Sequence, residues 1–332
     1  MKNYYRSFLT LLLLFGAANL FAQNKPATHT DSLMHEGIAL NDAGKYTEAL
    51  AKYDEVLKTY PESRTALYEK ALTLSTMGKN DDAIVIFEKL VSILHSAEAY
   101  AGLANAYDMK GDSKKAIEYY KQGIARWPKD RNLWFNLCVS YARQKNYVQS
   151  ELAAAEAIKA DPKHLRSYQN YAVAAYQQGR NAEALLGLSN LLMFGSNSRS
   201  LASCQIIKDI LHATPGNNAD PIAKMQQETI AQAVASSTSG KTNLTSIDSL
   251  TLQLTATYKA IKAQEDQYGS PFFSKYFGTY FGDIAASNYM DVYTRFIGVS
   301  LAPQENLAWL KTHPDDIKAF NTWLSTEKRD VE

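Results

Sequence analysis

Residues 97–130 read AEAYAGLANAYDMKGDSKKAIEYYKQGIARWPKD, and this stretch decides the fold. Apolar residues recur in its first half at spacings of three and four, which places Tyr100 and Tyr107 on one face of a helix. Gly111 has no Cβ, so it can end that helix in the left-handed region of backbone space. Pro128 closes a second helix because it lacks an N–H donor. The stretch therefore predicts a helical hairpin with one apolar side, which it cannot bury alone.

Further copies of this hairpin flank the quoted stretch at a period of about 34 residues. They span residues 30–63, 64–96, 131–164 and 165–198. Early in the second helix, the copies carry the pairs Ala49–Tyr53, Ala83–Phe87, Ala116–Tyr120, Ser150–Ala154 and Ala184–Leu188. The fourth of these pairs departs from the pattern, because Ser and Ala stand where Ala and an aromatic residue are expected.

This pattern resembles the tetratricopeptide repeat. Its first helix carries a bulky residue, Leu, a small residue and an aromatic, and its second helix carries Ala–x3–aromatic and then Pro. The resemblance covers residues 30–198, as about five units. It implies an all-α fold, a tetratricopeptide-repeat α-solenoid wound as a right-handed superhelix, in which the first helix of each unit lines a concave groove. A C-terminal helical unit is expected to follow the solenoid.

The first residues are typical of a secretory signal peptide. Lys2 and Arg6 precede an apolar run, residues 8–15, that is too short to span a bilayer comfortably. We expect residues 1–22 to be removed near Ala22, which leaves residues 23–29 as a spacer. This plan is similar to that of secreted tetratricopeptide-repeat proteins of Bacteroidetes-type bacteria, so the chain is expected to be exported, with a periplasmic location.

Charge and cysteine content narrow the range of partners. Residues 1–22 carry two of the 35 basic residues and none of the 34 acidic ones, so the remaining chain is nearly neutral. A neutral chain gives no electrostatic reason to expect nucleic acid or an anionic membrane as a partner. No later apolar stretch is long enough for a transmembrane segment. Cys138 and Cys204 are the two cysteines, and Cys138 falls where a repeat helix needs a small buried residue, so packing is favoured over a disulfide or a reactive thiol.

After residue 198 the repeat period is lost. We expect residues 199–234 to form degenerate repeat or capping helices, residues 235–246 to form a Ser- and Thr-rich linker, and residues 247–332 to form an aromatic-rich helical unit. Within that unit, residues 270–286 read SPFFSKYFGTYFGDIAA and place six aromatic residues along one helical stripe. The stripe is interpreted either as the core of a helix bundle, packed by Trp309, Phe320 and Trp323, or as an interfacial or partner-binding helix. No basic face accompanies it, which favours the core.

No constellation for catalysis is visible in the sequence. It contains no paired histidines with metal-ligand spacing, no Gly-rich phosphate loop and no nucleophile elbow. We therefore expect no catalytic residue, no metal, no cofactor and no enzymatic activity.

The candidate site is the concave groove of the repeats. Asn side chains donate and accept hydrogen bonds at once and can hold an extended peptide, and an Arg can form a paired contact with a carboxylate. The predicted partner-binding residues are Asn105, Phe135, Asn136, Val139, Arg166, Gln169 and Asn170. Part of this set also resembles the carboxylate clamp of chaperone-binding repeats, but Ala101 and Asn170 stand where that clamp has basic residues. The alternative is that these polar residues are solvated or serve contacts between helices.

Two hypotheses for function follow. The first is a scaffold in the cell envelope that binds a peptide or protein partner in the groove. The second is that the C-terminal unit acts as a membrane-peripheral or substrate-binding module, with the repeats as a spacer. The oligomeric state stays open. So does O-glycosylation at Asp31-Ser32 or Asp248-Ser249, two strings that resemble a bacterial acceptor motif.

Overall fold

The computed structural model describes residues 29–194, 200–214, 220–268 and 270–326. The expected signal peptide and all but the last residue of the expected spacer lie outside the described residues. Helices and no strands form in the part that is described, which confirms the all-α fold. The chain divides into two compact units, at residues 1–112 and 113–332.

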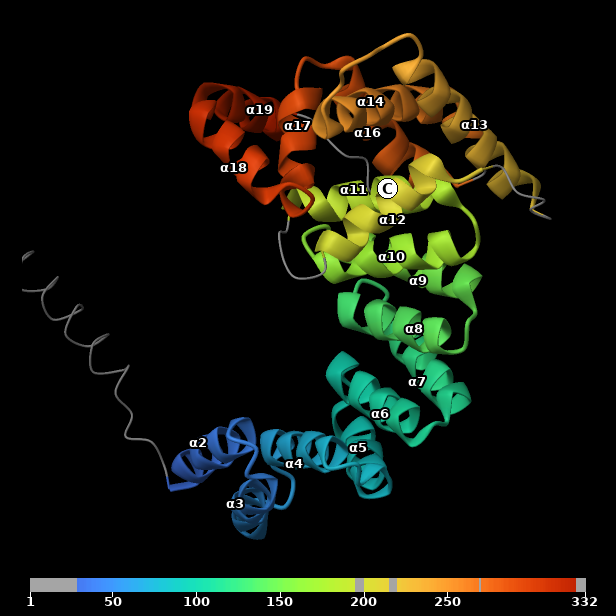
Figure 1. Cartoon of the computed structure of the whole chain (residues 1–332). Coiled ribbons are helices and arrows are strands. Elements are labelled where there is room, and N and C mark those ends of the chain that lie inside the picture. The colour runs from blue at the N-terminus through green and yellow to red at the C-terminus, as the bar shows by residue number, and fades with distance from the viewer. Residues whose placement is uncertain (1–28, 195–199, 215–219, 269, 327–332) are drawn as a thin grey trace, which may run out of the picture. The chain divides into compact units, whose positions relative to one another are not determined.

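The first unit is built from consecutive helices joined by short turns (Figure 1). Each helix packs against the next one along the chain. The helices are α2 (His29–Asp42), α3 (Tyr46–Thr59), α4 (Arg64–Thr76), α5 (Asn80–Leu94) and α6 (Ala97–Lys110). Gly111 follows α6 and adopts the expected left-handed conformation, with a φ of 91°.

The small residues of the repeat pattern make room for its aromatic residues. Tyr53 of α3 and Phe87 of α5 are almost completely buried. A Cβ added to Gly37 would lie 2.6 Å from the Tyr53 ring, and one added to Gly102 would lie 2.3 Å from the Phe87 ring. The alternation of large and small residues in the sequence is therefore a packing requirement between neighbouring helices.

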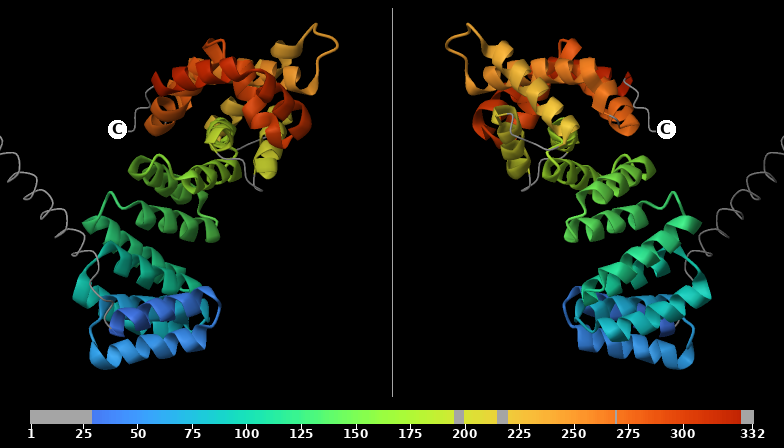
Figure 2. Two further views of the ribbon diagram at one scale, coloured as in Figure 1. Left: turned by 90° about the vertical axis from the view of Figure 1, so that its left-hand side faces the viewer. Right: turned by 90° about the vertical axis from the view of Figure 1, so that its right-hand side faces the viewer.

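The second unit continues the same plan. Its first helices are α7 (Ser113–Arg126), α8 (Arg131–Arg143), α9 (Tyr147–Ala160), α10 (Leu165–Gln177) and α11 (Asn181–Phe194). Both views of Figure 2 show α8 to α11 as successive layers. Cys138 of α8 and Cys204 are buried free thiols, and burial raises the pKa of the Cys138 thiol to about 11.

The rest of the second unit packs on the last repeat helices. These elements are α12 (Ser200–His212), α13 (Pro221–Thr238), α14 (Ser246–Gln264), α15 (Pro271–Phe273), α16 (Thr279–Ala286), α17 (Met290–Ile297), α18 (Pro303–Thr312) and α19 (Pro314–Thr326). Helix α13 continues through Thr238, so residues 235–238 of the expected linker are helical. Helix α11 contacts α12, α13 and α17, so residues C-terminal to the repeats share a core with them. Helix α14 begins with a capping box in which Thr245 and Asp248 each satisfy a backbone N–H of the other.

The aromatic stripe is buried against α10. Tyr276 and Tyr168 share a hydrogen bond between their hydroxyls, and Phe277 stacks on Tyr171 with ring centroids 5.4 Å apart. This agrees with the core interpretation, but the expected packing partners were wrong. Trp323 and Phe320 pack on Tyr289, and Trp309 stacks on His313, because the repeats already supply the surface that the stripe covers.

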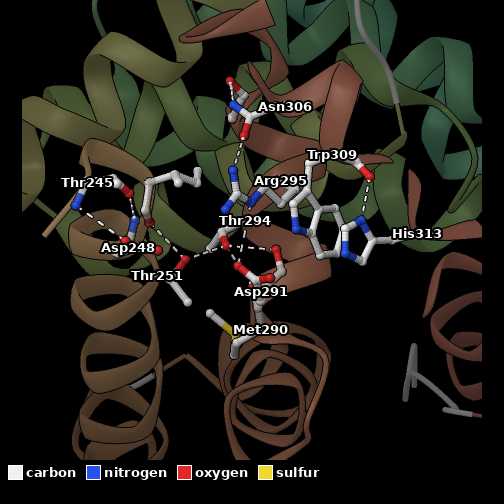
Figure 3. A network of polar contacts seen from close by, with 12 residues as sticks. Thr245, Asp248, Thr251, Met290, Asp291, Thr294, Arg295, Asn306, Trp309 and His313 are labelled. Atoms are coloured by element: carbon white, nitrogen blue, oxygen red, sulfur yellow. Dashed lines mark hydrogen bonds and ion pairs between the residues drawn. The ribbon is translucent and has the colours of Figure 1, made fainter. Parts of the chain in front are cut away.

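A polar network joins α14, α17 and α18 (Figure 3). Arg295 of α17 lies 5.3 Å from the ring centroid of Trp309, and its Nη1 is 3.1 Å from Glu305 Oε1. Buried Asn306 donates to the Gly298 carbonyl at 2.8 Å, which fixes the start of α18. No helix among the residues that the structure describes has the length and apolar character needed to cross a membrane.

Candidate functional site

A cavity of about 660 Å³ lies among α7, α8 and α9 of the second unit, closed on one side by the start of α15. We call it the α9 cavity. Its lining residues are Lys121, Ile124, Ala125, Trp134, Leu137, Tyr141, Gln149, Glu151, Leu152, Ala153, Ala155, Glu156, Lys159, Tyr171, Ser270, Pro271 and Phe272. Cavities of about 300–1,000 Å³ with mainly apolar walls are typical of small-molecule sites.

The walls of the α9 cavity are fixed by the helices that carry them. Trp134, Leu137 and Tyr141 follow one another at spacings of three and four, so they share one face of α8. The Trp134 indole N–H donates to the Pro128 carbonyl at 2.8 Å, which holds the ring in place. Helix α9 contributes the small side chains of Ala153 and Ala155, which leave the space open.

Four charged residues line the cavity, and three of them are paired. Lys159 Nζ is 2.7 Å from Glu156 Oε1 and 5.5 Å from the ring centroid of Phe272. Glu151 is held by Arg180, at 3.1 Å, and by the Gln178 amide. Lys121 has no ion pair among the described residues, and its Nζ lies 5.9 Å from the Tyr141 ring centroid. Lys121 is therefore the one charged residue of the lining without an ion pair in the described part of the chain.

Behind the cavity, two buried carboxylates share one guanidinium. Glu183 is completely buried and pairs with Arg180, which also holds Glu151. Burial raises the pKa of Glu183 to about 7, because the Arg180 charge only partly offsets the loss of hydration. Burial also raises the pKa of Glu151. Tyr171, which lines the cavity, has a buried hydroxyl without a hydrogen-bond partner.

The predicted groove residues lie elsewhere, and none of them lines the α9 cavity. Phe135 and Arg166 are brought together, with the guanidinium 4.9 Å from the ring centroid. Phe135 is only 7% exposed because Arg166 covers its face and the edge of His164 packs on it at 4.9 Å. Burial and the nearby Arg131 lower the pKa of His164, so its ring is neutral at neutral pH. Phe135 therefore does not form the open apolar wall that we expected, because the exposed guanidinium of Arg166 covers its ring.

The remaining groove residues are half-buried. Asn136 and Val139 lie on α8, and Gln169 and Asn170 lie on α10. Asn170 hydrogen-bonds the Cys138 thiol, so part of its polarity serves a contact between helices, as the alternative interpretation expected. Asn105 lies on α6 in the first unit.

Sequence reasoning missed the α9 cavity, although a signal was present. The fourth repeat replaces Ala and an aromatic residue by Ser150 and Ala154, and the side chains at residues 153–155 are all methyl groups. Ser150 turns inward and donates to the Cys138 carbonyl at 3.0 Å. No cluster of His, Cys, Asp and Glu suited to a metal ion occurs within the described ranges.

Comparison with known proteins agrees with the repeat pattern. Residues 39–191 match the family model described as the N-terminal TPR repeats region of Psidin. The general transcriptional corepressor trfA of Dictyostelium discoideum is 30% identical over 137 residues, which cover 40% of this chain and 10% of that protein. The general transcriptional corepressor ssn6 of Schizosaccharomyces pombe is 25% identical over 118 residues, which cover 35% of this chain and 11% of that protein. The chain thus spans about a tenth of the length of these relatives.

A solved structure is similar over a larger share of the chain. The crystal structure of a tetratricopeptide repeat protein from Parabacteroides merdae aligns with 82% of this chain and 98% of its own, at 15% identity and a TM-score of 0.45. The helix pairs and the packing of small against aromatic residues agree with the similarity of residues 39–191 to this family of tetratricopeptide repeats.

Proposed function

We propose that this chain is a non-enzymatic scaffold that binds a protein or peptide partner through the surface of its repeats. Tetratricopeptide repeats mediate interactions between proteins, and this role suits a stack of helical hairpins. The observation that carries the proposal is the pair Phe135–Arg166. It places an exposed guanidinium, stacked on a ring, on the first helices of two successive repeats.

The chemistry of this pair suits an acidic peptide. A guanidinium placed over an aromatic ring can still direct N–H groups to solvent, where they can form a paired contact with a carboxylate. Asn136 and Gln169 lie on the same two helices and offer amides that both donate and accept. The partner in this proposal is an extended segment that carries an acidic side chain or a C-terminal carboxylate. No nucleic acid is expected.

The location proposed for this scaffold is the cell envelope, after export. The support is the sequence of residues 1–22, whose cations and short apolar run are typical of a signal peptide. N-terminal sequencing of the protein from its native host tests this step. A mature chain that begins near residue 23 agrees with export, and an intact Met1 contradicts it.

The second candidate function is that the C-terminal unit acts as a membrane-peripheral or substrate-binding module, and burial of the aromatic stripe weighs against the membrane-peripheral form of it. Phe273, Phe277 and Phe281 have no exposed surface and Phe272 is half-buried, so the aromatic stripe offers little apolar surface to a bilayer. Partner binding by the repeats is therefore the function that we propose.

The test is a comparison of captured partners. The double substitution Asn136→Ala and Arg166→Ala removes polar groups from the repeat surface without opening the core, whereas Lys114→Ala and Gln122→Ala change exposed residues of α7 and serve as the matched control. Affinity capture with cross-linking in the native host should lose its partners with the first pair and keep them with the control. Equal recovery with both pairs would show that this surface is not the binding site.

A further inference from the structure

We propose that the α9 cavity is a binding site for a small organic anion with an apolar body, such as a fatty acid or an aromatic acid. This site is separate from the repeat surface around Phe135 and Arg166, and neither proposal depends on the other. Three features of the cavity lead to this ligand class: its volume and walls, its charge, and the unpartnered hydroxyl that lines it.

The volume and walls suit the apolar part of the ligand. The cavity has about 660 Å³, and rings from three separate elements line it: Trp134 and Tyr141 of α8, Tyr171 of α10 and Phe272 of α15. Contact with such rings removes apolar ligand surface from water, which supplies most of the binding free energy in sites of this kind. Leu152 lines the same cavity while remaining 57% exposed, so apolar surface reaches the mouth.

The charged residues that line the cavity favour a ligand with a negative charge. Glu151 contacts Arg180, which it shares with buried Glu183, and accepts a hydrogen bond from Gln178, while Glu156 pairs with Lys159. Lys121 is exposed at the mouth and has no ion pair within the part of the chain that the structure describes. An anionic head group placed beside Lys121 gains a charge-assisted hydrogen bond, while a cation there meets a like charge.

The third feature is the hydroxyl of Tyr171. This side chain is 1% exposed and lines the cavity, and its hydroxyl has no hydrogen-bond partner among the residues that the structure describes. A buried hydroxyl without a hydrogen bond destabilises the protein. A ligand oxygen that accepts a hydrogen bond from Tyr171 would remove that cost. The cavity therefore offers a cation at its mouth and one polar group among its apolar walls.

The cavity is bounded by small side chains of the fourth repeat and by a remote aromatic ring. Residues 153–155 of α9 carry only methyl side chains, and Phe272 reaches the cavity from a segment more than a hundred positions along the chain. Phe272 stacks on Tyr276, which bonds Tyr168 of α10. The wall is thus held by the packed aromatic stripe and is formed before any ligand arrives.

The test uses the full chain and two anionic probes, dodecanoate below its micellar concentration and 2-naphthoate, measured by isothermal titration calorimetry. Dodecyltrimethylammonium is the probe of opposite charge. Ala125→Trp fills the mouth from an exposed position of α7, and Lys121→Glu reverses the charge there. Lys114→Glu makes the same charge change on α7 away from the cavity, and thermal melts of every variant verify that it folds.

The proposal predicts that at least one anionic probe binds the unmodified chain more tightly than the cationic probe does. Ala125→Trp should weaken that binding by at least about ten-fold, Lys121→Glu by about five-fold, and Lys114→Glu by less than about two-fold. Failure of both anionic probes to bind, or equal affinity in the unmodified chain and Ala125→Trp, would overturn the proposal. If the anionic and cationic probes bind with equal affinity, the site does not select an anion and that part of the proposal is wrong. If no probe binds and Ala125→Trp instead loses a captured protein, the cavity is a protein-docking site and the proposal is wrong.

Discussion

The second and fourth repeats place different side chains at equivalent positions of their second helices. In α5 these positions hold Ala83, Ile84 and Phe87, and all three are buried among apolar neighbours. In α9 the same positions hold Ser150, Glu151 and Ala154. One repeat is filled by its own aromatic ring, whereas the other contains a buried carboxylate beside a cavity.

The difference shows how a repeat can gain a site without losing its fold. Helix α9 keeps the length and the neighbours of a repeat helix, since it packs on α8 and α10 as α5 packs on α4 and α6. The missing bulk is replaced from outside the repeat, by Tyr171 and Phe272. The hairpin framework therefore tolerates the change, and the cavity lies beside the changed helix, where Glu151 lines it.

The largest effect is expected from removing the ring that fills the second repeat. Phe87 is 1% exposed and packs against Gly102, so Phe87→Ala should lower the free energy of unfolding by about 3–5 kcal/mol. Urea denaturation measures this loss. A cost below about 1 kcal/mol would mean that the second repeat does not depend on its own ring, and the comparison with α9 would fail.

The next effect concerns the buried charges behind the cavity. Glu183 has a folded-state pKa of about 7 and an ordinary value of 4.5, so the folded chain binds the proton more tightly than the unfolded chain. Its contribution to stability is present below pH 4.5 and is lost as the pH rises through 7. Relative to Glu183→Gln, the unmodified chain should lose up to about 3 kcal/mol over that window.

Urea denaturation at a series of pH values measures this difference, with the exposed substitution Glu62→Gln as control. The free energy of unfolding of Glu62→Gln should change with pH as that of the unmodified chain does. If the difference in free energy of unfolding between the unmodified chain and Glu183→Gln is the same at every pH, the raised pKa of Glu183 is contradicted.

A smaller effect is expected from restoring the missing aromatic residue. Ala154 is 1% exposed and does not line the cavity, so Ala154→Phe should overpack its surroundings and destabilise the chain by about 1–3 kcal/mol. The thermal midpoint reports this change. An unchanged or higher midpoint would show that space for a ring remains behind Ala154, and that the fourth repeat is merely underfilled.

The smallest effect on stability is expected at the repeat surface. Arg166 is exposed and stacks on Phe135, so Arg166→Ala should cost less than about 1 kcal/mol while it weakens partner capture. Chemical denaturation and capture are measured on the same preparation. A large loss of stability would mean that Arg166 serves packing and would remove it from the proposed binding surface.

The repeat period predicts the helices and their local packing well. Tyr53 and Phe87 are buried as the period requires, and Gly111 ends α6 as expected. These features depend on residues a few positions apart or one repeat away, which the periodic pattern contains. The all-α fold of tetratricopeptide repeats follows from them.

The sites were less predictable because they depend on distant contacts. Arg166 covers Phe135 from the next repeat, and Phe272 closes the α9 cavity from the far end of the chain. A helical period states which residues share a face but not which remote segment covers that face. The exchange of an aromatic residue for Ala154 was visible, yet its consequence requires the position of α15.

The most direct test of the account is a crystal structure of the chain grown with 12-bromododecanoate, whose bromine is located by its anomalous signal. The account predicts a bromine peak inside the α9 cavity, with the carboxylate beside Lys121. A cavity closed by the side chains of α7 and α9, with bromine elsewhere or absent, would contradict it.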